Sequence, residues 1–167
     1  MPTTATMSSV HSSPYPAAHC IDGSEDGGTC QTQQETAPWM ALDYGNEVQV
    51  GSVVLMNRIN CCYYKTKNVN VRVSSTLPES SSEMFTGGQL LGTFVGPGTV
   101  GQRIEITGST QLTGRYVVVQ MDFTSEASEF NLNEVTAWRN GKICYSSLYI
   151  CPFYFFSSTL PSHPVFP

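Results

Sequence analysis

The sequence is poor in charge, and no part of it carries a long helical pattern. Only 13% of its 167 residues are charged, and 8 Lys and Arg stand against 13 Asp and Glu, which gives a formal net charge of -5. An acidic balance of this kind argues against a nucleic-acid-binding surface. No stretch keeps apolar residues at the spacing of an amphipathic helix. The chain is therefore expected to be all-β and to have no nucleic-acid partner.

Three further features are missing from the sequence. It contains no nucleophile-elbow, zinc-protease, P-loop or dinucleotide-binding motif, so we predict that the protein is not an enzyme. Residues 1–4 have neither the basic nor the apolar region of a signal peptide, and we expect the chain to be a fragment or an incomplete gene product. The apolar stretch Ile143–Phe156 is too short, and too interrupted by Ser and Pro, for a transmembrane helix.

Short apolar segments separated by turn residues predict strands. In the clearest of them, Val69, Val71 and Val73 alternate with polar residues, as in a strand with one buried face. Many short strands with turns between them are typical of a β-sandwich. The strands expected from this pattern are Val48–Asn57, Asn68–Val73, Thr93–Val95, Arg103–Ile106 and Tyr116–Phe123.

The segment Asn57–Lys65 carries the strongest functional pattern, because two adjacent cysteines lie between an arginine and a lysine. Consecutive Cα atoms are about 3.8 Å apart, whereas ordinary disulfides need roughly 4.4–6.8 Å. A Cys61–Cys62 bridge would therefore form a tight, strained ring with a flat apolar face. Arg58 and Lys65 would flank it as hydrogen-bond donors, an arrangement that suits a polyhydroxylated ligand such as a sugar. The alternative is that the two thiols are unbridged and that the neighbouring cations are simply exposed to water on a loop without a binding role.

These residues resemble the pattern of the F-type lectins, or fucolectins, which are related to the F5/8 type C (discoidin-like) domains. The family pattern has Arg-x-Asp, paired cysteines and then Arg or Lys; here Asn60 takes the place of the Asp. The resemblance extends to Ile21-Asp22-Gly23, to Pro38–Asp43 and to Leu132–Val135, and it implies two further strands, Pro38–Asp43 and the closing strand Phe130–Trp138. It implies a jelly-roll β-sandwich of the galactose-binding-like kind over residues 5–139. Residues 140–167 lie outside the resemblance and are expected to form a poorly ordered apolar and Pro/Ser-rich tail.

The resemblance also implies a sugar site whose usual triad is altered. Arg58, Lys65 and the Cys61–Cys62 pair match the family's sugar-binding positions. The family's His falls on Gln31 or on Thr32, depending on the direction of counting, and neither is His. Asn60 cannot neutralise the arginine as the family's Asp does. Sugar binding is therefore expected to be weakened.

A calcium site is implied in the same way. Asp22 and Glu134 match the family's two carboxylate ligands, and calcium prefers six to eight hard oxygen atoms. The remaining oxygens would be the carbonyls of His19, Ser24 and Asn133, with the carbonyl and hydroxyl of Thr29. The alternative is that Asp22 caps a turn and Glu134 is a surface residue of a strand.

The six cysteines point to an oxidising compartment. If Cys61 pairs with Cys62, the other four, Cys20, Cys30, Cys144 and Cys151, allow three pairings. Cys20–Cys30 is the local pairing, and Cys30–Cys144 is the one that would attach the tail. The sequence leaves this choice open.

Taken with the resemblance, the sequence predicts a secreted, calcium-containing carbohydrate-binding lectin domain. Its expected partners are fucosylated glycans or glycoproteins, in the setting of innate immune glycan recognition, and a homo-oligomer remains open. The alternative is a discoidin-like adhesion module that binds protein or membrane surfaces without recognising sugar. A polar concavity at Arg58 and Lys65 would favour the lectin, and exposed apolar side chains on the loops would favour the adhesion module.

Overall fold

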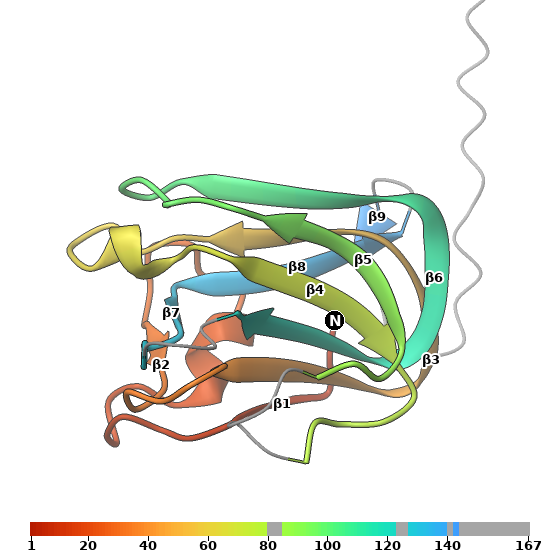
Figure 1. Ribbon diagram of the computed structural model, residues 1–167, viewed down its shortest axis with the longest axis horizontal. Coiled ribbons are helices and arrows are strands. Elements are labelled where there is room, and N and C mark those ends of the chain that lie inside the picture. The colour runs from red at the N-terminus through yellow and green to blue at the C-terminus, as the bar shows by residue number, and fades with distance from the viewer. Residues whose placement is uncertain (80–84, 123–126, 140–141, 144–167) are drawn as a thin grey trace, which may run out of the picture.

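The computed structural model describes residues 1–79, 85–122, 127–139 and 142–143 (Figure 1). Apart from two short 3-10 turns, the regular elements of these residues are strands, which confirms the expected all-β class. The turns are η1 (Ala17–Ile21) and η2 (Tyr63–Lys65). The strands are β1 (Thr4–Met7), β2 (Cys30–Gln31), β3 (Trp39–Met56), β4 (Val69–Ser74), β5 (Gln89–Phe94), β6 (Arg103–Met121), β7 (Asn131–Leu132), β8 (Glu134–Arg139) and β9 (Lys142–Ile143).

Two long strands, β3 and β6, bend and contribute to both layers of a sandwich (Figure 1). The order of the large sheet is β5-β4-β6-β3-β8-β9, with β1 paired to the first half of β3. The second half of β3 pairs with β8, while the second half of β6 pairs with β4. One continuous set of hydrogen bonds therefore folds over on itself and encloses the core.

The expectation of separate strands at 38–43 and 48–57, and at 103–106 and 116–123, is wrong, because each pair is one bent strand. The register between β3 and β6 shifts between Asp43 and Val48 and again between Val50 and Ser52. Gly45 lies in the first shift with a φ of 73°, a backbone conformation that favours glycine. Polar residues at such a bend interrupt the apolar pattern without ending the strand.

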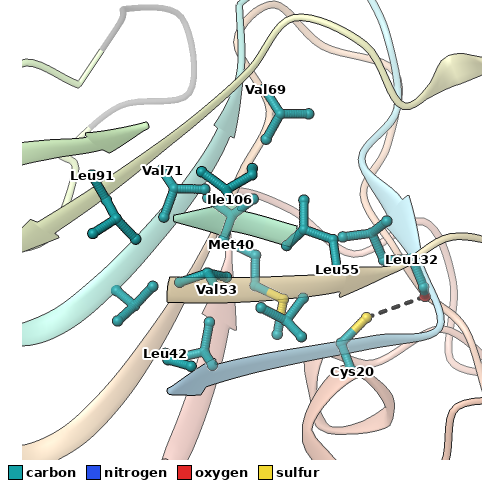
Figure 2. Packing of buried hydrophobic residues seen from close by; sticks show 14 of the residues in the cluster. Cys20, Met40, Leu42, Val53, Leu55, Val69, Val71, Leu91, Ile106 and Leu132 are labelled. Carbon is teal, nitrogen blue, oxygen red and sulfur yellow. Dashed lines mark hydrogen bonds between the residues drawn. The ribbon is translucent and has the colours of Figure 1, made fainter. Parts of the chain in front are cut away.

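The core lies between the layers and consists mainly of aliphatic side chains from both (Figure 2). The alternation predicted for β4 is confirmed, since Val69, Val71 and Val73 are at most 1% exposed. Trp39 lies on the other side of its strand, in a small buried cluster with Ala41 and Val118. No helix within the described ranges is long and apolar enough to cross a membrane.

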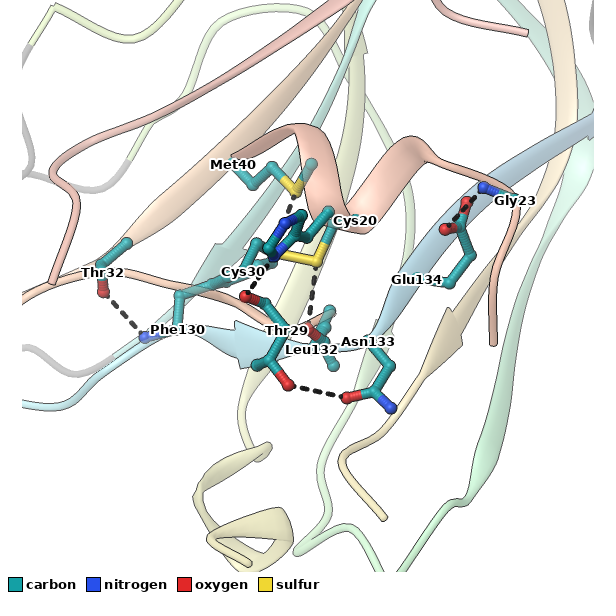
Figure 3. The surroundings of a disulfide bond; sticks show 11 residues. Cys20, Gly23, Thr29, Cys30, Thr32, Met40, Phe130, Leu132, Asn133 and Glu134 are labelled. Carbon is teal, nitrogen blue, oxygen red and sulfur yellow. Dashed lines mark hydrogen bonds between the residues drawn. A yellow bond between two sulfur atoms is a disulfide. The ribbon is translucent and has the colours of Figure 1, made fainter. Parts of the chain in front are cut away.

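A two-stranded sheet of β2 and β7 covers one end of the sandwich, at the left of Figure 1. A disulfide between Cys20 and Cys30 joins η1 to β2, so the local pairing is the one that forms (Figure 3). Cys144 and Cys151 lie outside the described residues. So does nearly all of the predicted tail, residues 140–141 and 144–167, while Lys142–Ile143 form β9 against Trp138–Arg139.

Candidate functional site

The loop after β3 is held in place by Asn57, a fully buried side chain at the end of that strand. Its amide nitrogen donates to the carbonyl oxygens of Tyr63 (3.0 Å) and Thr99 (2.9 Å). Its amide oxygen accepts from the Arg58 N–H (3.0 Å) and the Thr66 hydroxyl (2.9 Å). A Cβ at Gly98 would lie 2.3 Å from the Asn57 amide nitrogen, so the Gly96-Pro97-Gly98 segment needs its second glycine for this close approach. The paired cysteines and their flanking cations are therefore presented by a rigid loop.

The Arg58 guanidinium is buried, since the residue is only 6% exposed, and it is held by neutral oxygen atoms. Its Nε donates to Oδ1 of Asn60 (3.1 Å) and its Nη1 to Oε1 of Gln31 (3.1 Å). Among the described residues, Nη2 has no hydrogen-bond partner. Asn60 thus orients the arginine in the way expected of the family's Asp, but it leaves the positive charge in place.

The structure separates the two residues that match the family's His. Gln31, from β2, contacts Arg58 directly. Thr32 is fully buried, and its hydroxyl is used within the β2–β7 region, donating to the Gln33 carbonyl (2.9 Å) and accepting from the Phe130 N–H (2.9 Å; Figure 3). Successive side chains of a strand point to opposite faces, so only Gln31 reaches the arginine.

Lys65 pairs with an acid that sequence reasoning did not identify. Its Nζ lies 2.7 Å from Oε2 of Glu129, and the same oxygen accepts from Nε2 of Gln31 (3.1 Å). This hydrogen bond raises the pKa of Lys65. Glu129 precedes β7, whose pairing with β2 brings it beside Gln31. The site therefore contains an acid as well as two cations, and nothing in the local sequence around Glu129 marks it for this role.

Cys61 and Cys62 are present as thiols, so the predicted bridge between them is not formed in this structure. Their Sγ atoms lie 2.6 Å apart, and Cys62 has a left-handed backbone with a φ of 63°. The contact with the Cys61 thiol raises the pKa of Cys62. Because the two sulfur atoms already touch, the bridge stays a prediction for the protein in an oxidising compartment.

A second polar cluster joins the loop after η1 to the start of β8, 111 positions away from Gly23 (Figure 3). Oε2 of Glu134 accepts from the Gly23 N–H (3.2 Å), and Oδ1 of Asp22 accepts from the Ser24 N–H (2.8 Å). The Asn133 side chain accepts from the Thr29 hydroxyl (3.1 Å) and donates to the Glu25 carbonyl (3.1 Å). The predicted calcium residues therefore gather in one region.

The remaining predicted calcium residue, His19, packs over the same loop. Its Nδ1 lies 3.4 Å from the Thr29 carbonyl oxygen. A Cβ at Gly28 would lie 2.3 Å from that nitrogen, so the loop passes the imidazole at a position where only glycine fits without movement.

The electrostatics of this cluster suit a cation. Glu134 is only 6% exposed, and its pKa is raised to about 7, mainly by burial and further by the nearby Asp22 and Glu25 charges. A buried carboxylate facing two other acids is stabilised by a bound cation. In the part of the chain that the structure describes, no three His, Cys, Asp or Glu side chains are arranged around a common point. Carbonyl oxygens would therefore have to supply much of a calcium site, as calcium permits.

Comparison with known families gives one match over most of the fold. A family model described as the NedA-like, galactose-binding domain, of the F5/8 type C group, matches residues 19–119. The pentraxin fusion protein of Xenopus laevis is 30% identical over 78 residues, which make up 44% of this chain. Those residues are 19% of that protein, so the chain corresponds to less than a fifth of its length.

Solved structures resemble the whole sandwich. The fucolectin from serum of Morone saxatilis (striped bass) has a TM-score of 0.71 and 24% identity, over 80% of this chain and 45% of that one. The lectin domain of lectinolysin, complexed with Lewis B antigen, has a TM-score of 0.65 and 23% identity, over 82% and 92%. A fucose binding module of Streptococcus pneumoniae has a TM-score of 0.64 and 18% identity, over 82% and 91%. These likenesses confirm the predicted jelly-roll β-sandwich of the F5/8 type C kind.

Proposed function

Because this chain belongs to the family of NedA-like, galactose-binding domains, we propose that it is a carbohydrate-binding, lectin-like domain. Its ligand is a fucose-type glycan bound at the loop that carries Arg58 and the paired cysteines. Three structural relatives support this ligand class, since their descriptions name a fucolectin, a lectin domain complexed with Lewis B antigen and a fucose binding module. The partners are then fucosylated glycans or glycoproteins.

The observation that carries this proposal is the largely buried guanidinium of Arg58, whose remaining nitrogen, Nη2, is not among the buried unpartnered atoms of the described residues and is therefore open to a ligand. A charged group is costly to remove from water unless its hydrogen bonds are made. Arg58 is 6% exposed and gives Nε and Nη1 to neutral oxygens, while Nη2 has no partner among the described residues. A sugar hydroxyl or ring oxygen would accept from Nη2, and such charge-assisted bonds are among the stronger ones.

The adjacent cysteines would supply the apolar part of the site. The residues lie on the surface beside Arg58, with Cys61 exposed and Cys62 partly exposed. A pair of sulfur atoms presents a polarizable face to the C–H edge of a pyranose ring. In the bridged form it would do so with little side-chain freedom left to lose.

The test is a titration of multivalent α-L-fucose into the wild type, Arg58→Ala and Arg72→Ala. A multivalent probe is needed because avidity makes weak sites measurable. We expect Arg58→Ala to lose binding by roughly tenfold or more, which matches the loss of one charge-assisted hydrogen bond. Arg72 is the matched control, since the partners of its guanidinium within the described ranges are the carbonyls of Thr86 and Gly88. Wild-type binding that is indifferent to Arg58 would place the ligand elsewhere.

We further propose that calcium binds between the loop after η1 and the start of β8. The carboxylates of Asp22 and Glu134 would bind it together with the carbonyls of His19, Ser24, Thr29 and Asn133 and the hydroxyl of Thr29. The support is the convergence of these residues around a buried carboxylate that has acidic neighbours. Bound calcium would neutralise these charges and hold the loop against the sandwich. The cation would thus have a structural role.

We place the domain outside the cell, in the setting of innate immune glycan recognition. The Cys20–Cys30 disulfide supports an oxidising compartment. The pentraxin fusion protein shows that a related segment occurs within a longer chain. The activity and partners of any longer protein that contains this chain are part of the same proposal.

A discoidin-like adhesion module is the second candidate, favoured by exposed apolar residues at the same end of the molecule. Ile59, Tyr64 and Val100 are 49%, 57% and 56% exposed. Their loops touch, since the Gly101 N–H donates to the Arg58 carbonyl (2.9 Å). Flotation with phosphatidylserine-containing vesicles tests this candidate. Binding that is lost in an Ile59→Ser, Val100→Ser double variant, but kept in Arg58→Ala, would favour it over the lectin.

A further inference from the structure

The acid beside Lys65 has a chemical role in the proposed site that a pair of cations cannot fulfil. Arg58 and Lys65 offer only hydrogen-bond donors. Two cations alone would suit a ligand rich in acceptors, such as a sulfate or a carboxylate. A sugar hydroxyl both donates and accepts, so a site for neutral sugars also needs an acceptor.

Glu129 is placed to be that acceptor. Its Oε2 accepts from Lys65 (2.7 Å) and from Gln31 (3.1 Å), and within the described residues its Oε1 has no partner. The side chain is 19% exposed, so it is anchored and still reachable by a ligand. Its backbone is fixed as well, because the Glu129 carbonyl accepts from the Asn131 side chain (3.2 Å) and the next residue, Phe130, is fully buried.

Gln31 connects this acid to the arginine, and the charges fix its orientation. Its amide oxygen faces the Arg58 guanidinium (3.1 Å) and its amide nitrogen faces the Glu129 carboxylate (3.1 Å). The flipped amide would set N–H groups against the cation and an oxygen against the anion. Arg58, Gln31, Glu129 and Lys65 therefore form one hydrogen-bonded chain across the site.

We propose that Glu129 contacts the glycan directly, accepting a hydroxyl hydrogen through Oε1, and that it makes the site selective for neutral over anionic sugars. This inference rests on the proposed carbohydrate-binding function. The carboxylate attracts the hydroxyl hydrogen and repels a sulfate or carboxylate on the ligand. One side chain therefore strengthens the binding of a neutral sugar and weakens the binding of an anionic one.

The test compares polymer-bound α-L-fucose with the same polymer carrying fucose sulfated at O2, O3 or O4. We expect the wild type to bind the neutral polymer best. Glu129→Gln keeps the size of the side chain but removes its charge, so neutral binding should fall by about tenfold while binding of at least one sulfated form rises. Glu129→Asp keeps the charge, but its shorter side chain moves the carboxylate oxygens away from the ligand. This variant should therefore bind the neutral polymer less well without binding any sulfated polymer better.

Glu47→Gln is the matched control, because it makes the same change of net charge at an exposed position on the bend of β3. It should leave the ranking of the polymers unchanged. Melting curves of all variants exclude unfolding as the cause of a loss. If the wild type binds through Arg58 but Glu129→Gln keeps the wild-type ranking, the role of Glu129 is overturned while the lectin function stands. If no polymer is bound, or binding ignores Arg58, both proposals fail.

Discussion

At the scale of single residues, the loop after β3 depends on Asn57, whose side-chain amide has a hydrogen-bond partner for both its nitrogen and its oxygen. Asn57 makes four hydrogen bonds from a fully buried position and connects β3, η2 and the turn around Gly98. Of these partners, only Arg58 is next to Asn57 in the sequence. The sequence shows only that an Asn precedes the arginine, and its structural role comes from residues up to 42 positions away.

We predict that Asn57→Ala lowers the free energy of unfolding by about 2–4 kcal/mol, because it leaves several buried polar groups unpaired. Asn57→Asp should be at least as harmful, since a carboxylate oxygen would then face two carbonyl oxygens. Urea denaturation measures both, with exposed Asn46→Ala as the control. An Asn57→Ala protein as stable as the wild type would contradict this role.

A second prediction at this scale concerns the adjacent cysteines. Their sulfur atoms lie 2.6 Å apart as thiols, and we expect them to be bridged in protein produced in an oxidising compartment. The unreduced peptide that contains both residues should then be about 2 Da lighter than the reduced one. Full alkylation of both thiols without prior reduction would rule the bridge out.

At the scale of elements, the bends of β3 and β6 decide how one sheet becomes two layers. Asp43 and Arg115 lie at the bend on neighbouring strands and form two hydrogen bonds of 2.8 and 2.7 Å. Asp43 also accepts from the Gly45 N–H (2.7 Å), and the guanidinium lies over the Tyr116 ring at 4.9 Å. The bend is thus fixed by polar contacts that the apolar pattern of the sequence does not reveal.

The hydrogen bond from Arg115 lowers the pKa of Asp43 below its ordinary value of 3.8. A group whose pKa is lowered by folding stabilises the folded state above its unfolded pKa, and this contribution is lost as the pH falls through the folded pKa. We therefore predict that Arg115→Ala lowers the Tm at pH 5–7 and that its difference from the wild type shrinks below about pH 4.

The control for this prediction is Asp43→Asn, in which the charge is absent at every pH. Adding Arg115→Ala to it should change the Tm by an amount that does not depend on pH between 3 and 6. A wild-type advantage that persists unchanged to pH 3 would assign the effect of Arg115 to its packing on Tyr116.

At the scale of the whole molecule, the sequence predicts the architecture better than it predicts the site. Alternating valines, turn residues and the family resemblance lead to the jelly-roll sandwich, because burial on one face leaves a period in the sequence. The site is assembled from β2, the loop after β3 and the residues before β7, which are far apart in the chain. Glu129 could not be predicted, since its role depends on the β2–β7 pairing. The choice between Gln31 and Thr32 likewise depends on which face of β2 meets Arg58.

The calcium proposal also belongs to this scale, because the predicted ligands come from two segments that lie 104 to 111 positions apart in the sequence. Calcium at a hundredfold excess over its Kd would stabilise the protein by about 2.7 kcal/mol, which raises the Tm of a domain of this size by roughly 5–10 °C. Differential scanning fluorimetry with calcium, with magnesium and with chelator measures this. Magnesium should have a smaller effect, since it demands a compact octahedral site.

Two charge-removing variants separate a metal site from a structural cluster. In Asp22→Asn the side-chain oxygen can still accept from the Ser24 N–H, so the turn is kept while the calcium response should fall. In Glu134→Gln the response should fall as well, and the metal-free protein should melt higher than the metal-free wild type, because a buried carboxylate beside Asp22 and Glu25 has been neutralised. Exposed Glu105→Gln is the control. A chelator that leaves the wild-type melting curve unchanged, or an Asp22→Asn protein with the full calcium response, would show that these residues hold the loop without a metal.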